Sequence, residues 1–332
     1  MHRTHKLLAA GAMLALGSAL PAYALDKVVF GTNWLAEAEH GGYYQAIADG
    51  TYAKYGLEVS ITQGGPQSPN EALLISGKVD FYMGSMLSLY NDVQQGIPMI
   101  NVAAIFQKDP QVLIAHPEVK TFADLANLDT IYMGDEGFAT YFTWMKANFK
   151  GFRDEQFKPY TFNSAPFVAN AKSAEQGYLT SEPLAVKQMA GWEPSVFLLA
   201  DQGYSPYSTT IETSLKLLQE KPDLVKRFVE ATIIGWYNYL YGDNKAANDL
   251  IKKDNPEMTD EQIAYSIGKL KEYGIVVSGD AVDKGIGCMT DEREKSFYDL
   301  MVSLKIVPST VDYKKTYDNQ FVCKGLGLDL VK

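Results

Sequence analysis

The chain has 332 residues and a formal net charge of −10 with histidine neutral. So acidic a protein is not expected to bind nucleic acid, because the phosphate backbone would repel it. At about 150 residues per domain, the length predicts two domains, each large enough for a core of its own.

The first 24 residues are typical of a secretory signal peptide. Arg3 and Lys6 precede an apolar run over residues 7–20, and a small-x-small sequence ends at Ala24. No later apolar run has the roughly 18 residues that a membrane span needs, and no cysteine stands at the cleavage point to carry a lipid anchor. We therefore expect the mature chain free in an extracytoplasmic space.

Cys288 and Cys323 are the two cysteines of the chain. An exported protein meets oxidising conditions, which predicts a disulfide between them, with two buried thiols as the alternative. Their spacing fits neither a metal site nor a redox motif.

Residues 28–65 predict the unit around which the fold is organised. A strand over 28–31, a helix from His40 that stops at Gly56 and a strand over 57–62 form a βαβ unit. In parallel sheets the loop that leaves a strand's carboxyl end is where ligands bind. That loop brings together Asn33, Trp34, Glu39 and His40.

The next elements complete this domain and begin a second one. A helix from Ser68 to Gly77, a strand over 79–83, a helix opened by Gly84 and Ser85 and ending at Gly96, and a buried strand over 99–106 are predicted in turn. Residues 112–117 are expected to cross to the second domain. Its predicted elements are a helix over 122–128, a strand over 130–133, a helix over 139–149, a strand over 160–162, a helix over 165–173 and a strand over 196–200.

The chain then returns to the first domain through a loop and strand over 201–210. We therefore expect lobe I to comprise residues 25–113 and 206–332, and lobe II residues 114–205. Two crossings between lobes form a hinge. Packing helices are predicted over 222–241, 245–253, 259–273 and 291–304.

No signature of an enzyme is present: the chain lacks GxSxG, HExxH, a P-loop and a GxGxxG after a strand. Only His40 and His116 follow the signal peptide, which leaves little for a metal site or a catalytic triad. His116 is expected to be structural, whereas His40 could contact a ligand or begin a helix. We expect no catalytic residue, metal or cofactor.

The segment GYLTSEP holds a second group of candidates. Pro183 disfavours a helical conformation at Glu182 and so predicts that Glu182 lies in an extended loop, with Tyr178 nearby. Asn163 and Phe167 follow the preceding predicted strand. Alternatively, Glu182 is a solvent-exposed carboxylate with no role in binding.

Charge in the candidate loops indicates the ligand class. None of the four arginines falls in these loops, which instead carry the acids Glu37, Glu39, Asp135, Glu136, Glu182 and Asp201. Sulfonate, nitrate, phosphate or dicarboxylate would need a basic clamp or a helix N-terminus. Aromatic rings beside acids favour a flat, neutral or cationic ring with N–H donors. The aromatic candidates are Trp34, Tyr43, Tyr82, Phe106, Phe138, Tyr141, Tyr178, Tyr204 and Tyr207, some of which could simply line the cores.

Several segments resemble a known family. NWxxxxxHxGYYxA, SGKVDFxMGS, QGYxTSEP and MTDxR are similar to the NMT1/THI5-like periplasmic substrate-binding proteins of ABC importers, above all the binders of thiamine pyrimidine precursors. The resemblance implies an α/β, two-lobed type II periplasmic binding fold with the ligand between the lobes. It implies a monomer whose partners are a small molecule and an inner-membrane ABC permease with its ATPase. Trp34, His40, Tyr43, Tyr178 and Glu182 fall on motif positions that face the ligand in the family.

Pyrimidine-synthesising enzymes that share this fold carry a cofactor-bearing lysine, a second histidine and a cysteine-rich motif. Residues 84–88 of this chain hold no lysine or histidine, and no cysteine cluster is present, so that function is disfavoured. Binders of sulfonates, aromatic carboxylates or riboflavin remain alternatives. The expected ligand-contact residues are Asn33, Trp34, Glu39, His40, Tyr43, Gly84, Ser85, Phe106, Phe138, Tyr141, Asn163, Phe167, Tyr178, Glu182 and Tyr207.

Overall fold

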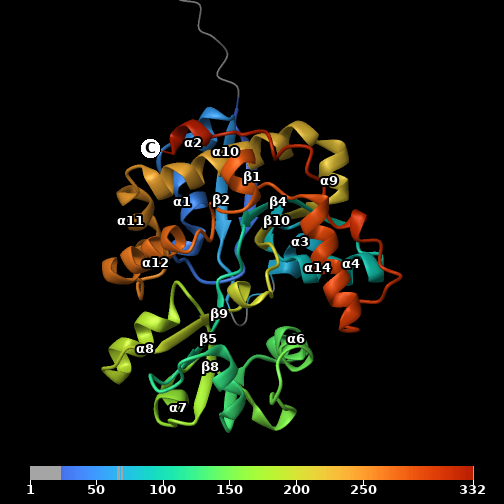
Figure 1. Cartoon of the computed structure of the whole chain (residues 1–332). Coiled ribbons are helices and arrows are strands. Elements are labelled where there is room, and N and C mark those ends of the chain that lie inside the picture. Colours follow the sequence, from blue (N-terminus) through green and yellow to red (C-terminus); the bar gives the residue numbers. More distant parts are fainter. Residues whose placement is uncertain (1–23, 66–67, 69, 332) are drawn as a thin grey trace, which may run out of the picture.

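The computed structural model describes residues 24–65, 68 and 70–331 of the chain, so the predicted signal peptide lies outside the described residues except for Ala24. Two mixed five-stranded sheets form two lobes, with lobe II below lobe I in Figure 1. This is the α/β fold that the sequence predicted.

Lobe I is built on the sheet β2-β1-β3-β10-β4. Its strands are β1 (Asp26–Gly31), β2 (Leu57–Thr62), β3 (Phe81–Gly84), β4 (Met99–Phe106) and β10 (Ser208–Ser214). β1 runs parallel to β2 and β3, whereas β10 is antiparallel to β3 and β4. The predicted βαβ unit is therefore present at this edge of the sheet.

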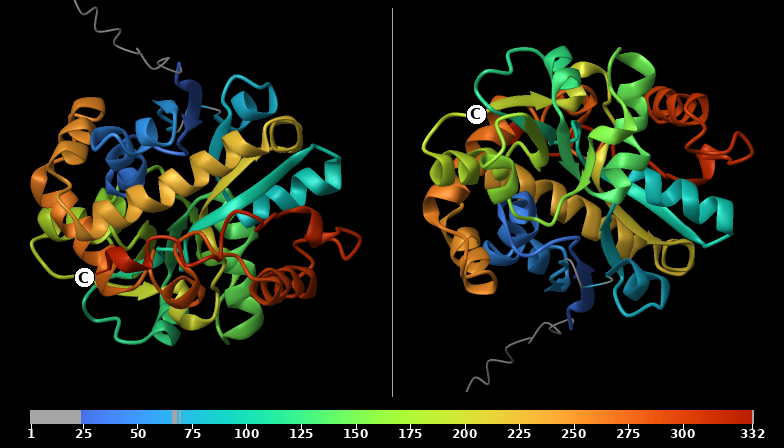
Figure 2. Two further views of the ribbon diagram at one scale, coloured as in Figure 1. Left: turned by 90° about the horizontal axis from the view of Figure 1, so that it is seen from above. Right: turned by 90° about the horizontal axis from the view of Figure 1, so that it is seen from below.

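Helices cover both faces of this sheet (Figure 2). Those from the first part of the chain are η1 (Ala38–His40), α1 (Gly41–Ala48), α2 (Thr51–Lys54), α3 (Asn70–Ile75) and α4 (Met86–Gln95). The C-terminal part adds α9 (Leu215–Glu220), α10 (Pro222–Tyr241), α11 (Lys245–Asp254), α12 (Asp260–Glu272), α13 (Asp280–Lys284), α14 (Asp291–Ser303), η5 (Tyr313–Lys315) and η6 (Leu328–Leu330). The predicted C-terminal helices agree with α10, α11, α12 and α14 to within one residue at each end.

Close packing of α1 on α10 organises the core of lobe I. A side chain at Gly42 would come within 2.2 Å of the Trp236 ring, so only glycine allows the two helices this approach. Phe228 of α10 stacks on Phe81 of β3 at 4.0 Å between ring centroids. The packing of α1 on α10 thereby holds the loop that precedes α1 in place.

Lobe II is built on the sheet β7-β6-β8-β5-β9. Its strands are β5 (Gln111–Ala115), β6 (Thr130–Met133), β7 (Phe157–Pro159), β8 (Ser173–Tyr178) and β9 (Ser195–Leu198). The helices around it are η2 (Phe122–Asn127), α5 (Asp135–Ala139), α6 (Tyr141–Asn148), η3 (Asp154–Gln156), α7 (Ala165–Val168), α8 (Glu182–Ala190) and η4 (Leu199–Gln202).

The first crossing lies earlier than the sequence predicted. Residues 112–117 were expected to cross between the lobes, but β5 begins at Gln111 and pairs with both β8 and β9. Val112 to Ala115 are fully buried, so this run is an inner strand of lobe II rather than a linker. The crossing is residues 107–110, and the expected boundary at residue 114 falls inside a strand.

Two further predictions can be assessed within the described residues. Cys288 and Cys323 form a disulfide with an S–S distance of 2.06 Å, as predicted. His116 donates from Nε2 to the Phe167 carbonyl at 3.0 Å and packs on Trp192, which confirms its structural role. In the part of the chain that the structure describes, no helix is long and apolar enough to cross a membrane.

Candidate functional site

The candidate site lies where the two lobes meet, between the β1–α1 loop of lobe I and the end of β8 with the start of α8 in lobe II. Ser266 and Gln262 of α12 both donate to the Thr180 carbonyl, at 2.7 and 2.9 Å. Trp34 contacts Phe162 across the junction, with ring centroids 5.0 Å apart. The β1–α1 loop and the turn before α8, which come from separate motifs, therefore both lie at this junction.

Glu39 and His40 are buried at this junction with unsatisfied polar atoms. Glu39 is 5% exposed and His40 is 0% exposed. Glu39 Oε1 and both His40 ring nitrogens have no hydrogen-bond partner among the described residues. Burial lowers the pKa of His40 to about 3, so the ring is neutral and offers one donor and one acceptor. Buried polar atoms without partners are rare, and these are available to a ligand.

Glu182 does not lie in an extended loop, contrary to the sequence prediction. It is the first residue of α8, and Pro183 occupies the first turn, where its missing N–H is not needed. The start of α8 overrides the usual preference of a residue before proline for an extended backbone. Glu182 Oε2 accepts a hydrogen bond of 2.7 Å from the Tyr178 backbone N–H, which aims the carboxylate back toward β8.

Three carboxyl groups from both lobes converge at the junction. Burial, and next the neighbouring carboxylates of Glu39 and Glu182, raise the pKa of Glu37 well above its usual value. Burial is also the largest cause that raises the pKa of Glu39 to about 7, with Glu182 adding to it, while Thr180 opposes it. The same desolvation raises the pKa of Glu182. Burial at the junction therefore disfavours the charged form of all three carboxyls, a cost that a hydrogen-bond donor or a cation would offset.

No arginine of the described chain balances these carboxyls. Arg153 donates to carbonyls of lobe II at Ala126 and Leu128, and Arg227 pairs with Asp26 and Asp223. Arg293 donates to the Gln107 carbonyl at 2.7 Å. The geometry thus supports the view from sequence that the loops lack a basic clamp.

The structure adds residues that sequence reasoning did not select. Glu175 of β8 is 0% exposed, neither carboxylate oxygen has a partner among the described residues, and burial raises its pKa to about 7. Asp109 lies in the first crossing, where burial raises its pKa to about 6. Both were missed because the sequence reading misplaced the crossing and did not recognise β8 as a strand.

Phe162 is the third added residue, and its backbone is strained. Its φ of 57° lies in the left-handed region, which costs a bulky side chain about 1–2 kcal/mol. Strain of this kind gathers at functional positions. The sequence placed Phe162 in a strand, whereas β7 ends at Pro159.

Two predicted residues from lobe II face the junction. Burial, and next the nearby carboxylates of Asp109, Glu37 and Glu136, raise the pKa of Tyr178 well above its usual value. Tyr141 donates to Gln176 Oε1 at 3.0 Å.

Other predicted residues serve the interior of one lobe. Phe106 and Tyr43 are fully buried against Trp236, and Phe167 is fully buried against His116. Phe138 packs on Phe157 at 4.4 Å. Their aromatic character reflects core packing.

The remaining predicted residues shape local backbone. Ser85 caps α4 by accepting from the Ser88 N–H at 3.2 Å, and Asn163 Oδ1 accepts from the Ala165 N–H at 3.0 Å. A side chain at Gly84 would come within 2.3 Å of Glu212 Oε2. Asn33 is exposed in the β1–α1 loop.

One side chain, Arg293, contacts both crossings between the lobes. Arg293 donates to the Gln107 carbonyl and to Gln107 Oε1 in the first crossing, and its guanidinium lies 3.9 Å from the ring centroid of Tyr207 in the second. The Tyr207 hydroxyl donates to Asp280 Oδ2 at 3.0 Å. A cavity of about 390 Å³ adjoins these groups, with Lys108 and Ser205 in its lining.

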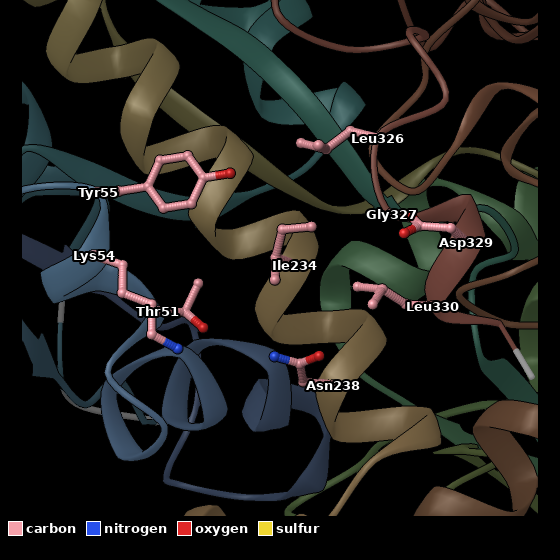
Figure 3. Close-up of a pocket in the computed structure, with 9 residues that line it drawn as sticks. All are labelled: Thr51, Lys54, Tyr55, Ile234, Asn238, Leu326, Gly327, Asp329 and Leu330. Carbon is pink, nitrogen blue, oxygen red and sulfur yellow. The ribbon is translucent and has the colours of Figure 1, made fainter.

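A second cavity, of about 450 Å³, lies elsewhere on lobe I (Figure 3). It is enclosed by α2, α10 and the C-terminal segment, and its lining comprises Thr51, Lys54, Tyr55, Ile234, Asn238, Leu326, Gly327, Asp329 and Leu330. None of these belongs to the junction.

Comparison with known proteins agrees with this architecture. The family model described as NMT1/THI5 like matches residues 37–246. The riboflavin-binding protein RibY of Chloroflexus aurantiacus is 24% identical over 312 residues, which are 91% of this chain and 87% of RibY. The 4-amino-5-hydroxymethyl-2-methylpyrimidine phosphate synthase of Schizosaccharomyces pombe is 28% identical over 116 residues, 34% of this chain and 33% of the synthase.

Solved structures share the fold. The periplasmic aliphatic sulphonate binding protein SsuA of Escherichia coli has a TM-score of 0.65 at 13% identity, covering 87% of this chain and 91% of SsuA. RibY and SsuA, which match along most of the chain, are binding proteins rather than enzymes. The chain belongs to the NMT1/THI5-like family and has the two-lobed fold of the periplasmic substrate-binding proteins of ABC importers.

Proposed function

We propose that the protein is the periplasmic receptor of an ABC importer, which captures a small aromatic heterocycle between its lobes and delivers it to the permease and its ATPase. Family, fold and the disulfide support an exported binding protein. The observation that carries the ligand class is the convergence of Glu37, Glu39 and Glu182, with which no arginine among the described residues pairs.

The chemistry of these groups selects a ligand with N–H donors or a positive charge. Glu39 Oε1 is unsatisfied, and one oxygen of Glu182 is not used by Tyr178. In a site that excludes water, a hydrogen bond from such a ligand to a carboxylate contributes about 1.5–3 kcal/mol. Trp34 and Tyr178 offer aromatic faces to a flat ring. An amino-substituted pyrimidine of the thiamine-precursor type has this character.

An anionic ligand fits the junction less well. The N-termini of α1 and α8 would attract an anion, but Glu39 lies just before the first and Glu182 occupies the first turn of the second. We therefore do not carry over to this chain the sulfonate ligand named for SsuA. A flavin remains the second candidate, because RibY matches 91% of the chain and a flavin is also flat and bears an N–H.

A thermal-shift panel of the mature protein tests the proposal. The panel comprises aminopyrimidines, purines, flavins, alkanesulfonates and aromatic carboxylates. A ligand present at 100 times its Kd should stabilise the protein by about 2.7 kcal/mol, a readily measured shift in Tm. We expect a response to an aminopyrimidine. A response to riboflavin alone would select the flavin candidate, and a response to sulfonates alone would contradict the proposed ligand class.

A matched pair of variants separates site from surface. Glu182→Gln should reduce the response to the panel hit. Glu193→Gln, which alters an exposed carboxylate paired with Lys187 on the same lobe, should leave it unchanged. Equal responses in both variants would remove Glu182 from the site.

A further inference from the structure

Phe162 combines two features that are unfavourable in an isolated lobe. Its side chain is 59% exposed, and its backbone has a left-handed φ of 57°. Aromatic rings are usually buried in a core, and a left-handed backbone is usually formed by glycine. Neither preference explains a phenylalanine at this position. Within lobe II its ring is 5.5 Å from Tyr160, so the second aromatic contact, with Trp34, comes from the other lobe.

The loop that carries Trp34 is fixed from several sides. The Trp34 carbonyl accepts from the Gly64 N–H at 3.1 Å and from the Thr32 hydroxyl at 2.7 Å. Two residues later, the Ala36 carbonyl accepts from Asn255 Nδ2 at 2.9 Å. These bonds tie the loop to β2 and to α11 of its own lobe. Trp34 is therefore a rigid half of the pair.

The loop that carries Phe162 is held within lobe II alone. Tyr160 donates its N–H to the Met133 carbonyl at 3.0 Å on one side, and Asn163 accepts from the Ala165 N–H on the other. A movement of lobe II about the hinge therefore carries Phe162 away from Trp34. Separation would expose to water the part of each ring that the other ring covers.

We propose that Phe162 is the closure residue of this receptor: its ring docks on Trp34 when the lobes close, and this contact sets the ratio of closed to open molecules. The ring contact concerns closure and not the identity of the ligand, because it is made between two side chains of the protein. Phe162 acts here as a positioning residue that brings the lobe II carboxylates to those of lobe I.

The experiment records 19F NMR spectra of ligand-free mature protein labelled with 5-fluorotryptophan. Trp34→Phe assigns the Trp34 resonance among the four tryptophans. In Phe162→Ala we expect this resonance to move to a solvent-exposed position, and the radius of gyration in X-ray scattering to increase. The open-to-closed ratio should rise by about two- to tenfold, the range that one aromatic pair supports. Phe162→Tyr keeps the ring and should retain the wild-type behaviour.

Two further variants separate the ring from its backbone and from general surface effects. Phe162→Gly accepts the left-handed φ without strain, so it should open the protein as Phe162→Ala does while raising the Tm relative to that variant. Met189→Ala removes an apolar side chain that is 53% exposed on the same lobe and should change neither the resonance nor the radius. An unchanged Trp34 resonance and radius in both Phe162→Ala and Phe162→Gly would overturn the proposal.

Discussion

The two ends of the interlobe junction are built by different means. At the hinge end, Arg293 joins both crossings, and Gln107 also donates to the Cys288 carbonyl at 2.9 Å beside the disulfide. At the mouth, Glu39 and His40 lack partners among the described residues, and the lobes meet through the Trp34–Phe162 ring contact and through the hydrogen bonds from Ser266 and Gln262 to the Thr180 carbonyl. At the hinge end these polar groups are hydrogen-bonded within the protein. At the mouth, Glu39 and His40 have polar atoms that are available to a ligand.

This difference implies that changes at the hinge end should lower the stability of the fold, whereas changes at the mouth should alter closure and binding.

Removal of the disulfide should have the largest effect on stability. The double variant Cys288→Ser and Cys323→Ser opens a loop with a sequence separation of 35 residues. On the chain-entropy model this lowers the free energy of unfolding by about 3–4 kcal/mol. Urea unfolding followed by circular dichroism measures the loss. An unchanged midpoint would show that the hinge end does not depend on this crosslink.

Arg293→Ala should also destabilise the protein, because it leaves the Gln107 carbonyl without its donor. The loss of a hydrogen bond to a charged group that leaves a buried acceptor unsatisfied is expected to cost about 2–3 kcal/mol. Scattering should in addition show a changed radius of gyration.

Arg153→Ala is the matched control for the hinge. Arg153 also donates to backbone carbonyls, but within lobe II. We expect it to lower stability while leaving the radius of gyration unchanged. If both arginine variants affect the radius equally, Arg293 has no particular role at the hinge.

Stability should fall as the pH rises through the range in which Glu39 ionises. Because burial raises the pKa of Glu39 from 4.5 to about 7, the folded state binds more protons than the unfolded state between these values. This stabilisation is complete below pH 4.5 and is lost as the pH approaches 7, amounting to about 2 kcal/mol across pH 5–7.

Comparison with Glu39→Gln isolates this contribution. Around Glu39 stand the carboxyls of Glu37 and Glu182, the neutral ring of His40 and the hydroxyl of Tyr239. The amide cannot ionise, so the difference in unfolding free energy between wild type and variant should shrink toward low pH. A difference that is constant from pH 5 to 7, measured by urea unfolding, would contradict the raised pKa.

Glu182→Gln should affect binding more than folding. The amide keeps the shape and can still accept from the Tyr178 N–H, but it replaces one acceptor oxygen with a donor that would face the ligand's own N–H. We expect the affinity for the panel hit to fall at least tenfold, about 1.4 kcal/mol, by calorimetric titration. Stability should change little, because no core packing is altered. A loss of stability without a loss of affinity would place Glu182 among the structural residues.

Local sequence patterns predicted the elements whose burial follows a simple repeat: β4 is buried throughout, β6 alternates, and α10 buries one face. The apolar runs that became β4 and β6, and the amphipathic pattern of α10, gave these elements with the bounds that the structure shows. Glycines that end helices and the cysteine pair were equally readable. A helix end depends on residues close together in the chain, and each of the two cysteines has only the other as a possible partner.

Tertiary structure decided what depends on partners distant in the chain. The run 112–115 became a strand of lobe II because β8 and β9 supply hydrogen bonds on both of its sides. Glu182 began a helix because the packed end of β8 turns the chain there, which outweighs the local preference of a residue before proline. The approach of Phe162 to Trp34 depends on how two separate lobes meet. No local pattern encodes that contact, because its energy comes from surface that is buried only when the lobes are joined.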